Sequence, residues 1–175
     1  MPIRLIREED WPVIDGIQQQ AYADHLLENI DVLKSKWLAS PSTCFIHTND
    51  QNGKPMGYLL AHAWPDDTPP KLHQVISHHP VTTGLLQENV GLYLHDLALA
   101  NDAKGKGVAT QLVKHFLAYA EHNGFSRILL VAVQGSESFW SRFGFETSSN
   151  LESDCSYGDN SKIMTLKLSS CSATD

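Results

Sequence analysis

The sequence has few cysteines, little positive charge and no long apolar run. Its three cysteines (Cys44, Cys155 and Cys171) are an odd number without the spacing of a metal site or a disulfide framework. Free thiols are typical of a reducing compartment, so we expect a cytoplasmic protein. No apolar stretch is long enough to span a bilayer, and the charged N-terminal residues contain no signal-peptide core. We therefore expect no membrane partner.

Positive charge is scarce, because 13 Lys and Arg stand against 20 Asp and Glu and give a formal net charge of -7. Nucleic-acid phosphates bind to basic surfaces, so the composition argues against general nucleic-acid binding. An acidic surface favours cationic partners such as amines, and it serves solubility equally well. The 175 residues, 42% of them hydrophobic, are enough for one domain with one core.

Apolar periodicity and turn residues predict alternating strands and helices. We expect strands at residues 3–7, 44–48, 56–62, 92–99, 128–133 and 162–168, and helices at residues 11–22, 31–38, 108–123 and 136–143. The helix between residues 92–99 and 128–133 predicts a parallel crossover within a mixed sheet. The last strand is expected beside residues 128–133 or their hairpin partner. Residues 65–90 fit neither pattern and form a long loop, a kind of segment that often carries function.

A glycine-rich turn, Lys104-Gly105-Lys106-Gly107, joins the strand at residues 92–99 to the following helix. Backbone N–H groups at a helix start are unpaired, and the helix dipole adds positive potential, so such a turn can bind phosphate. Glycine also leaves these amides accessible. The spacing is neither that of a Rossmann fingerprint nor that of a P-loop, and two glycines before a helix also occur in plain tight turns.

Two motifs in order resemble the GNAT superfamily of N-acetyltransferases. The segment Lys104-Gly105-Lys106-Gly107-Val108-Ala109 is similar to the acetyl-CoA motif [Q/R]-x-x-G-x-[G/A], although the Gln or Arg that opens the motif is missing. The segment Phe139-Trp140-Ser141-Arg142-Phe143-Gly144-Phe145 is similar to the aromatic-Tyr-x-x-x-Gly-Phe segment after the family's fifth strand. The resemblance covers roughly residues 3–168. We expect one acetyltransferase domain at residues 1–168 and a disordered tail at residues 169–175.

The resemblance implies an α/β (α+β) fold with a mixed, mostly antiparallel sheet of six to seven strands. About four helices flank the sheet, which is splayed between strands four and five. It also implies acetyl-CoA as co-substrate, with the pyrophosphate on the glycine turn and the pantetheine arm along the fourth strand. The residues expected to bind the donor are Leu97, Ala98, Leu99, Lys104, Gly105, Lys106, Gly107, Val108, Ala109, Thr110, Gln134 and Phe139.

Acetyl transfer to an amine is helped by a base, because an alkylammonium has a pKa of about 10. The strand Tyr93-Leu94-His95-Asp96-Leu97 is similar to the corresponding strand of serotonin N-acetyltransferases, in which a matching His is the base. The resemblance implies that His95 is the base, with a structural, half-buried His as the alternative. Asp96 competes as a base acting through water, or it pairs with a loop. Two-residue alternation places His95 on one face with Tyr93 and Leu97, and Asp96 on the other, barring a bulge.

The proton donor departs from the family pattern, because Trp140 stands where the usual Tyr would protonate the thiolate. An indole N–H donates a hydrogen bond but no proton. Either no acid is needed, since a thiol has a pKa of about 8.5, or Tyr157 supplies the proton. A loop Tyr that only covers apolar surface is the alternative. We expect Tyr93, Trp64 and Trp140 to contact the acceptor.

The sequence thus predicts an N-acetyltransferase that moves the acetyl group of acetyl-CoA to a primary amine of a small molecule, by direct attack in a ternary complex. A protein or peptide acceptor, or a non-catalytic acyl-CoA-binding module, are the alternatives. The histidines His62, His73, His78 and His79 lack zinc-site spacing, so we expect no metal. A homodimer is the commonest assembly for a soluble oligomer.

Overall fold

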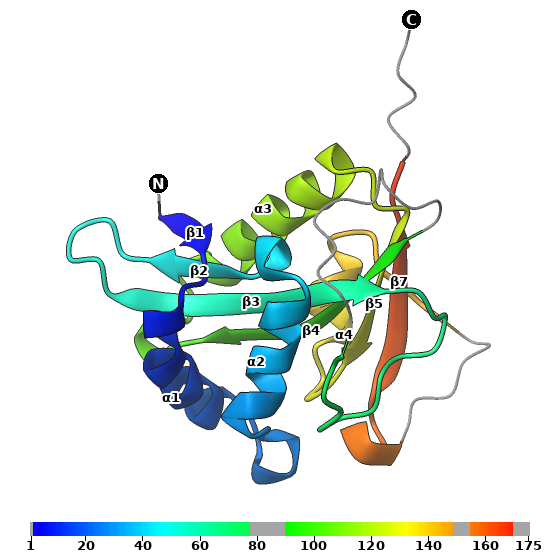
Figure 1. Ribbon diagram of the computed structural model, residues 1–175, viewed down its shortest axis with the longest axis horizontal. Helices are drawn as coiled ribbons and strands as arrows, with labels where there is room; N and C mark the ends of the chain where they lie inside the picture. The colour runs from blue at the N-terminus through cyan, green and yellow to red at the C-terminus, as the bar shows by residue number, and fades with distance from the viewer. Residues whose placement is uncertain (1, 78–89, 149–154, 170–175) are drawn as a thin grey trace, which may run out of the picture.

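The computed structural model describes residues 2–77, 90–148 and 155–169. One seven-stranded sheet carries helices on both faces (Figure 1). The strands are β1 (Ile3–Leu5), β2 (Phe45–Thr48), β3 (Pro55–Trp64), β4 (Gly91–Leu99), β5 (Arg127–Ala132), β6 (Glu146–Thr147) and β7 (Lys162–Lys167). The α-helices are α1 (Trp11–Ala21), α2 (Ile30–Ala39), α3 (Val108–His122) and α4 (Glu137–Ser141). Short 3-10 turns include η2 (Asp24–Leu26) before α2 and η6 (Cys155–Tyr157) before β7.

The strand order is β1-β2-β3-β4-β5-β7-β6. Every neighbouring pair is antiparallel except β4 and β5, which are parallel. The sequence prediction of a mostly antiparallel sheet with this one parallel crossover is confirmed, as is the position of β7 beside β5. The two-residue strand β6 was not predicted, because two residues are too few to show a period.

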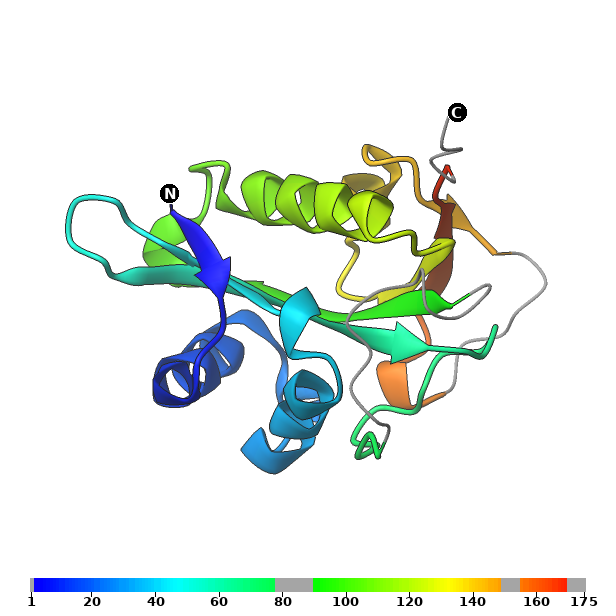
Figure 2. The same ribbon diagram turned by 45° about the horizontal axis from the view of Figure 1, so that its top comes forward.

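Helices α1 and α2 cover one face of the sheet, and α3 covers the other (Figure 2). Each helix turns an apolar stripe inward: Ile14 and Ile17 of α1 are buried, as are Leu112 and Phe116 of α3. These stripes are the periodic apolar positions that predicted the helices. No helix in the described parts of the chain is long and apolar enough to cross a membrane.

Strands β4 and β5 separate partway along β4. β5 pairs with Leu92, Tyr93 and Leu94 of β4, whereas the pairing of β4 with β3 continues to Leu99. The backbone of β4 beyond Leu94 therefore faces a gap in the sheet, and the predicted splay is confirmed. This gap positions the site described below.

A β-bulge lies in β4 at the same point. Leu60 pairs with Asp96 and Ala61 pairs with Leu94, so His95 is the extra residue. His95 contacts Glu28 and Asp96 contacts Tyr22, which both belong to the α1–α2 layer. The alternation that placed Asp96 on the face opposite His95 was expected only without a bulge. It does not hold here, because the bulge resets the register and turns both side chains to one face.

The domain limits at residues 1–168 stay a prediction. The expected tail falls almost entirely on residues 170–175, which lie outside the described residues. The expected long loop at residues 65–90 is described only up to residue 77 and from residue 90. Cys44 is a buried, free cysteine.

Candidate active site

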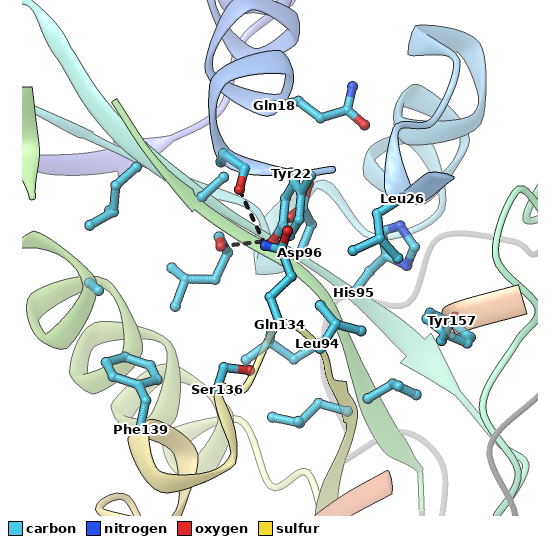
Figure 3. Close-up of a pocket in the computed structure, with 18 of the residues that line it drawn as sticks. Gln18, Tyr22, Leu26, Leu94, His95, Asp96, Gln134, Ser136, Phe139 and Tyr157 are labelled. Carbon is cyan, nitrogen blue, oxygen red and sulfur yellow. Dashed lines mark hydrogen bonds between the residues drawn. The ribbon is translucent and has the colours of Figure 1, made fainter. Parts of the chain in front are cut away.

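A cavity of about 320 Å³ lies where β4 and β5 separate (Figure 3). This volume is within the range of small-molecule sites, at its lower end. Ser136 and Phe139, from the segment after β5, border one end, whereas Leu26, His95 and Tyr157 lie toward the other. The two ends can therefore hold different parts of a reaction complex.

The glycine turn has the backbone shape and the open space that a phosphate cradle needs. Gly105 and Gly107 both have φ of 75°, in the left-handed region. A Cβ on Gly105 would meet no atom within 4 Å, and one on Gly107 would meet only Nε2 of Gln111 at 3.9 Å. Gly107 also precedes α3 without a side-chain cap, so the first amides of the helix remain available. The turn therefore fits the pyrophosphate of coenzyme A.

Most residues expected to bind the donor lie around the end of the cavity that is next to the glycine turn. Those that line it are Leu97, Ala98, Leu99, Lys104, Ala109, Gln134 and Phe139. The others lie in the turn and in the first turn of α3, beside the cavity wall and not on it: Gly105, Lys106, Gly107, Val108 and Thr110.

Gln134 closes a bridge between the end of β5 and the end of α1. Its Nε2 donates to the Ala21 carbonyl at 3.2 Å, and its Oε1 accepts from the Ala23 amide at 3.1 Å. Its φ of 52° is uncommon for a residue with a side chain. The two hydrogen bonds to Ala21 and Ala23 hold Gln134 in this uncommon backbone conformation.

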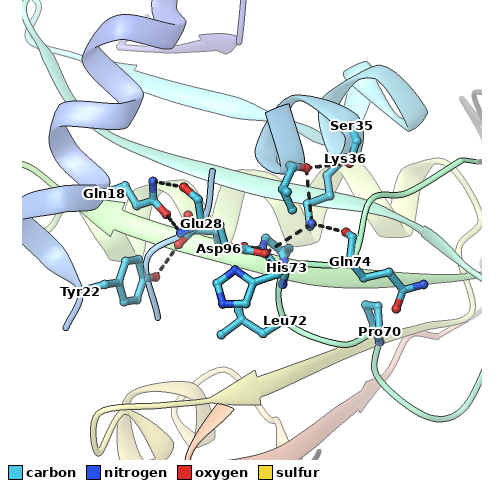
Figure 4. Close-up of polar contacts among 12 residues, drawn as sticks. Gln18, Tyr22, Glu28, Ser35, Lys36, Pro70, Leu72, His73, Gln74 and Asp96 are labelled. Carbon is cyan, nitrogen blue, oxygen red and sulfur yellow. Dashed lines mark hydrogen bonds and ion pairs between the residues drawn. The ribbon is translucent and has the colours of Figure 1, made fainter. Parts of the chain in front are cut away.

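His95 points toward a buried carboxylate (Figure 4 draws the contacts of that carboxylate). Its Nε2 donates to the carboxylate of Glu28, and its Nδ1 is buried with no partner among the described residues. The His73 amide donates to the same carboxylate at 2.8 Å, and the Lys36 ammonium lies 3.7 Å away. The carboxylate therefore fixes the orientation of the ring, because Nε2 must carry the hydrogen that the carboxylate accepts.

The Glu28 carboxylate is an anion despite its burial. Burial by itself raises the pKa of Glu28, but the charges and hydrogen bonds of His95, Lys36 and the His73 amide outweigh it and lower the pKa to about 2. Burial lowers the pKa of the Lys36 ammonium, and Glu28 opposes this shift. Lys36 also donates to the Gln74 carbonyl at 2.9 Å, which ties the segment after β3 to α2.

Asp96 has a different environment from Glu28. The hydroxyl groups of Tyr22 and Tyr58 each lie 2.5 Å from its carboxyl oxygens, and the Tyr22 hydroxyl also lies 2.9 Å from the Leu97 carbonyl. The Tyr22 hydroxyl has one proton, which it donates to the Asp96 carboxyl and shares with the Leu97 carbonyl. Burial raises the pKa of Asp96, against the lowering effect of His95 and the two tyrosines.

Tyr157 borders the end of the cavity at which Leu26 and His95 lie, and its hydroxyl is already engaged. It donates to the Pro70 carbonyl at 2.7 Å and lies 3.0 Å from the hydroxyl of Tyr93. Tyr93 is buried behind it and does not line the cavity. Proton donation by Tyr157 to a sulfur would require it to release Pro70, with Tyr93 placed to replace the proton.

The two predicted tryptophan contacts differ. Trp140 lines the cavity and packs edge-to-face against Phe139 and Phe145. Trp64 does not line it: the indole donates to the Thr68 carbonyl at 2.8 Å and packs in a separate cluster with Tyr93. The structure therefore gives Trp64 a packing role and no contact with the cavity.

Sequence reasoning missed Tyr22, Glu28, Lys36 and Leu72, which reach the site from helices and loops with no motif of their own. Among the described residues, no three His, Cys, Asp or Glu side chains form a group that could hold a metal ion. His62 is buried, and its Nδ1 lies 3.0 Å from the Ala63 carbonyl oxygen. The backbone amide of His73 donates to the Glu28 carboxylate. His78 and His79 lie outside the described residues.

Comparison with solved structures shows the same fold in several acetyltransferases. Ard1 from Thermoplasma volcanium is 15% identical, with a TM-score of 0.66 over 95% of this chain and 97% of the other. The ribosomal-protein-S18-alanine N-acetyltransferase from Escherichia coli is 18% identical, with a TM-score of 0.66 over 99% and 97%. N-acetylglutamate synthase from Neisseria gonorrhoeae, complexed with coenzyme A and L-arginine, is 18% identical, with a TM-score of 0.62 over 95% of this chain and 32% of that longer one.

A search of curated protein sequences found no match. The sequence profile described as "Acetyltransferase (GNAT) family" matches residues 3–145, which is most of the chain. The match includes the glycine turn, the splayed strands and the segment that ends at Phe145. The chain therefore belongs to the acetyltransferase (GNAT) family, whose acyl donor is acetyl-CoA.

Proposed function

We propose that this acetyltransferase transfers the acetyl group of acetyl-CoA to a primary amine of a small molecule, by direct attack in a ternary complex. The observation that carries the proposal is the imidazole of His95, which lies on the cavity at the splay of β4 and β5. Its Nε2 is fixed by Glu28, and its Nδ1 has no partner among the described residues. This is the arrangement of a general base held in one tautomer by a carboxylate.

The residues divide the reaction between the two ends of the cavity. The amides of Gly105 to Thr110 would hold the pyrophosphate, and the unpaired edge of β4 from Leu97 to Leu99 would hold the pantetheine arm. Acetyl-CoA supplies the thioester whose carbonyl the amine attacks. His95 takes the proton of the amine, and the negative charge of Glu28 stabilises the imidazolium that results.

Tyr157 is the proposed proton donor for the departing thiolate. Its phenol stays protonated at neutral pH, whereas the Trp140 indole has no proton to give. The Tyr93 hydroxyl at 3.0 Å supports this role, because it provides a second proton next to the first. If the thiolate needs no acid, Tyr157 acts as a wall of the cavity alone.

A peptide acceptor is the second candidate function. It is favoured by the fold neighbours, one of which acts on the alanine of ribosomal protein S18 and another of which is a NatC complex bound to Gag peptide and coenzyme A. The segment Pro70–Ile76 favours a small molecule. Hydrogen bonds with Lys36, Ser35 and Tyr157 hold this segment against the end of the cavity proposed to bind the amine, which we call the acceptor end.

A cytoplasmic location and a homodimer stay predictions.

The test is release of free coenzyme A thiol, measured after mixing the protein and acetyl-CoA with a panel of small primary amines and with peptides that have free N-termini. We expect amine-dependent thiol release with small amines. Donor binding without thiol release from any acceptor would contradict the proposed transfer.

A further inference from the structure

The acceptor end of the cavity has its own apolar cluster, separate from the main core. Leu26, Leu72 and Tyr157 form its buried centre, and Tyr22, Val131 and Val133 pack against them. All six side chains also line the cavity. We call these six residues the apolar cradle. They come from the end of α1, η2, the segment after β3, the end of β5 and η6, so the cradle exists only in the folded chain.

Hydrogen bonds hold the cradle in place from two sides. On one side the Leu72 amide donates to Oγ of Ser156 at 3.3 Å, and Tyr157 donates to the Pro70 carbonyl. On the other side the next amide, that of His73, donates to Glu28. The side chain of Leu72 is therefore fixed next to both Tyr157 and the carboxylate that orients His95. A preformed apolar wall needs little ordering when a ligand binds.

The charged and acidic side chains on the described cavity wall either have partners within the protein or lie away from the apolar cradle. Of the described lining residues, Glu28 and Asp96 are the carboxylic acids, and Lys104 is the only lysine or arginine. Glu28 is engaged by His95, Lys36 and the His73 amide, and Asp96 by Tyr22 and Tyr58. Lys104 belongs to the glycine turn, where the donor phosphates are expected. Among the lysines, arginines and carboxylic acids of the described cavity lining, neither a second ammonium nor a carboxylate on the acceptor would find a free partner beside the cradle.

From these contacts we infer that the acceptor is a primary monoamine with an apolar body, an alkyl or aryl group that the apolar cradle encloses. This inference rests on the proposed function, because it names the acceptor of that reaction. One amine nitrogen lies at His95, and the carbon skeleton extends over Leu26, Leu72 and Tyr157. Diamines, amino acids and peptide N-termini are poor acceptors.

The selection has two physical causes. Each methylene moved from water into the cradle improves binding by about fourfold. A second charge in the same place loses its hydration and gains no partner, which costs more than one methylene gains. The preference between a neutral and a charged tail should therefore exceed about 10-fold.

The experiment compares acceptors that differ by one charge, with thiol release as the readout. Pentylamine is compared with 1,5-diaminopentane, and 2-phenylethylamine with phenylalanine. We expect kcat/KM to be at least about 10-fold higher for the member of each pair whose tail carries no second charged group. Equal or higher kcat/KM for the diamine, the amino acid or a peptide would overturn the inference.

A pair of variants tests whether the cradle itself makes the choice. Leu26→Glu introduces a carboxylate into the cradle, and Leu26→Gln introduces a neutral side chain of the same size. Leu26→Glu should raise the ratio of kcat/KM for 1,5-diaminopentane to that for pentylamine by roughly 10-fold over Leu26→Gln. An unchanged ratio in folded variants would place the acceptor tail elsewhere and overturn the inference.

Binding separates failure of this inference from failure of the proposed function. If no amine releases thiol, the proposed transfer is wrong, and calorimetry of the same amines with the coenzyme A complex measures the cradle directly. Tighter binding of pentylamine than of 1,5-diaminopentane would still support an apolar monoamine site. Equal or weaker binding would overturn it.

Discussion

The carboxylate of Glu28 accepts a hydrogen bond from Nε2 of His95, which lies 67 residues further along the chain. Glu28 stands in the turn before α2, and His95 is the bulged residue of β4. The same carboxylate accepts from the amide of His73. The carboxylate of Glu28 thus holds both the proposed base and the segment that carries Leu72 of the apolar cradle.

His95→Gln should lower kcat/KM by roughly 10²-fold, the range for the loss of a general base. The acidic limb of the pH–rate profile should also change, because the proposed base is gone. His47→Gln is a matched control. His47 is also buried, with Nε2 bonded to the Gln111 side chain and an Nδ1 that has no partner in the described part of the chain, but it does not line the cavity. If both variants keep the wild-type rate and pH profile, His95 is structural.

Gly107→Val should abolish measurable binding of coenzyme A in calorimetry. The branched side chain would stand where the phosphate must approach the amides, and φ of 75° disfavours it. Gly53→Val is the control, since Gly53 has φ of 68° with open space around it but lies in the β2–β3 hairpin. Both variants carry the same backbone strain, so wild-type affinity in a folded Gly107→Val protein would reject the phosphate cradle.

Tyr157→Phe should lower kcat, with unchanged coenzyme A affinity and loss of the basic limb of the kcat profile. The reason is that the phenol is the proposed donor to the thiolate. Tyr93→Phe removes the neighbouring hydroxyl, which lies 3.0 Å from that of Tyr157, and should lower kcat less than Tyr157→Phe because the proposed donor itself remains. Trp140→Phe should cost little beyond packing. A basic limb that survives in Tyr157→Phe would leave Tyr157 as a wall only.

Asp96→Asn should keep kcat/KM, measured by thiol release, within about threefold. The reason is that the hydroxyl groups of Tyr22 and Tyr58 occupy both carboxyl oxygens of Asp96, which leaves His95 as the proposed base. A folded variant with a loss near 10²-fold would make Asp96 the base instead.

The stability of the fold should fall in acid as Glu28 takes up a proton. Its pKa is about 2 in the folded protein against an ordinary value of 4.5, so the folded state prefers the ionised form. This stabilisation is complete above pH 4.5 and is lost as pH falls toward 2, by on the order of 3 kcal/mol. Denaturant unfolding across this range should show a steeper pH dependence in the wild type than in Glu28→Gln. Glu9→Gln, at an exposed position, should match the wild type.

The sequence by itself determined most of the framework. The apolar periods of residues 11–21 and 108–122 are local, and so are the glycine turn and the strand that precedes it. Helices α1 and α3, strand β4 and the turn itself could therefore be predicted from neighbouring residues. The parallel crossover followed from chain connectivity. The family motifs added the splay of strands four and five and the candidate His95.

Only the tertiary structure decided which side chains from other segments complete the site. The bulge at His95 depends on the register with β3, and it turns His95 and Asp96 to one face. Glu28, Tyr22 and Leu72 sit in segments without a motif, and they reach the cavity because α1, α2 and the loop after β3 pack on that face. A period in the sequence reports which face of an element is buried. It does not report which distant side chain will meet a carboxylate there, because that contact is made by packing between segments far apart in the chain.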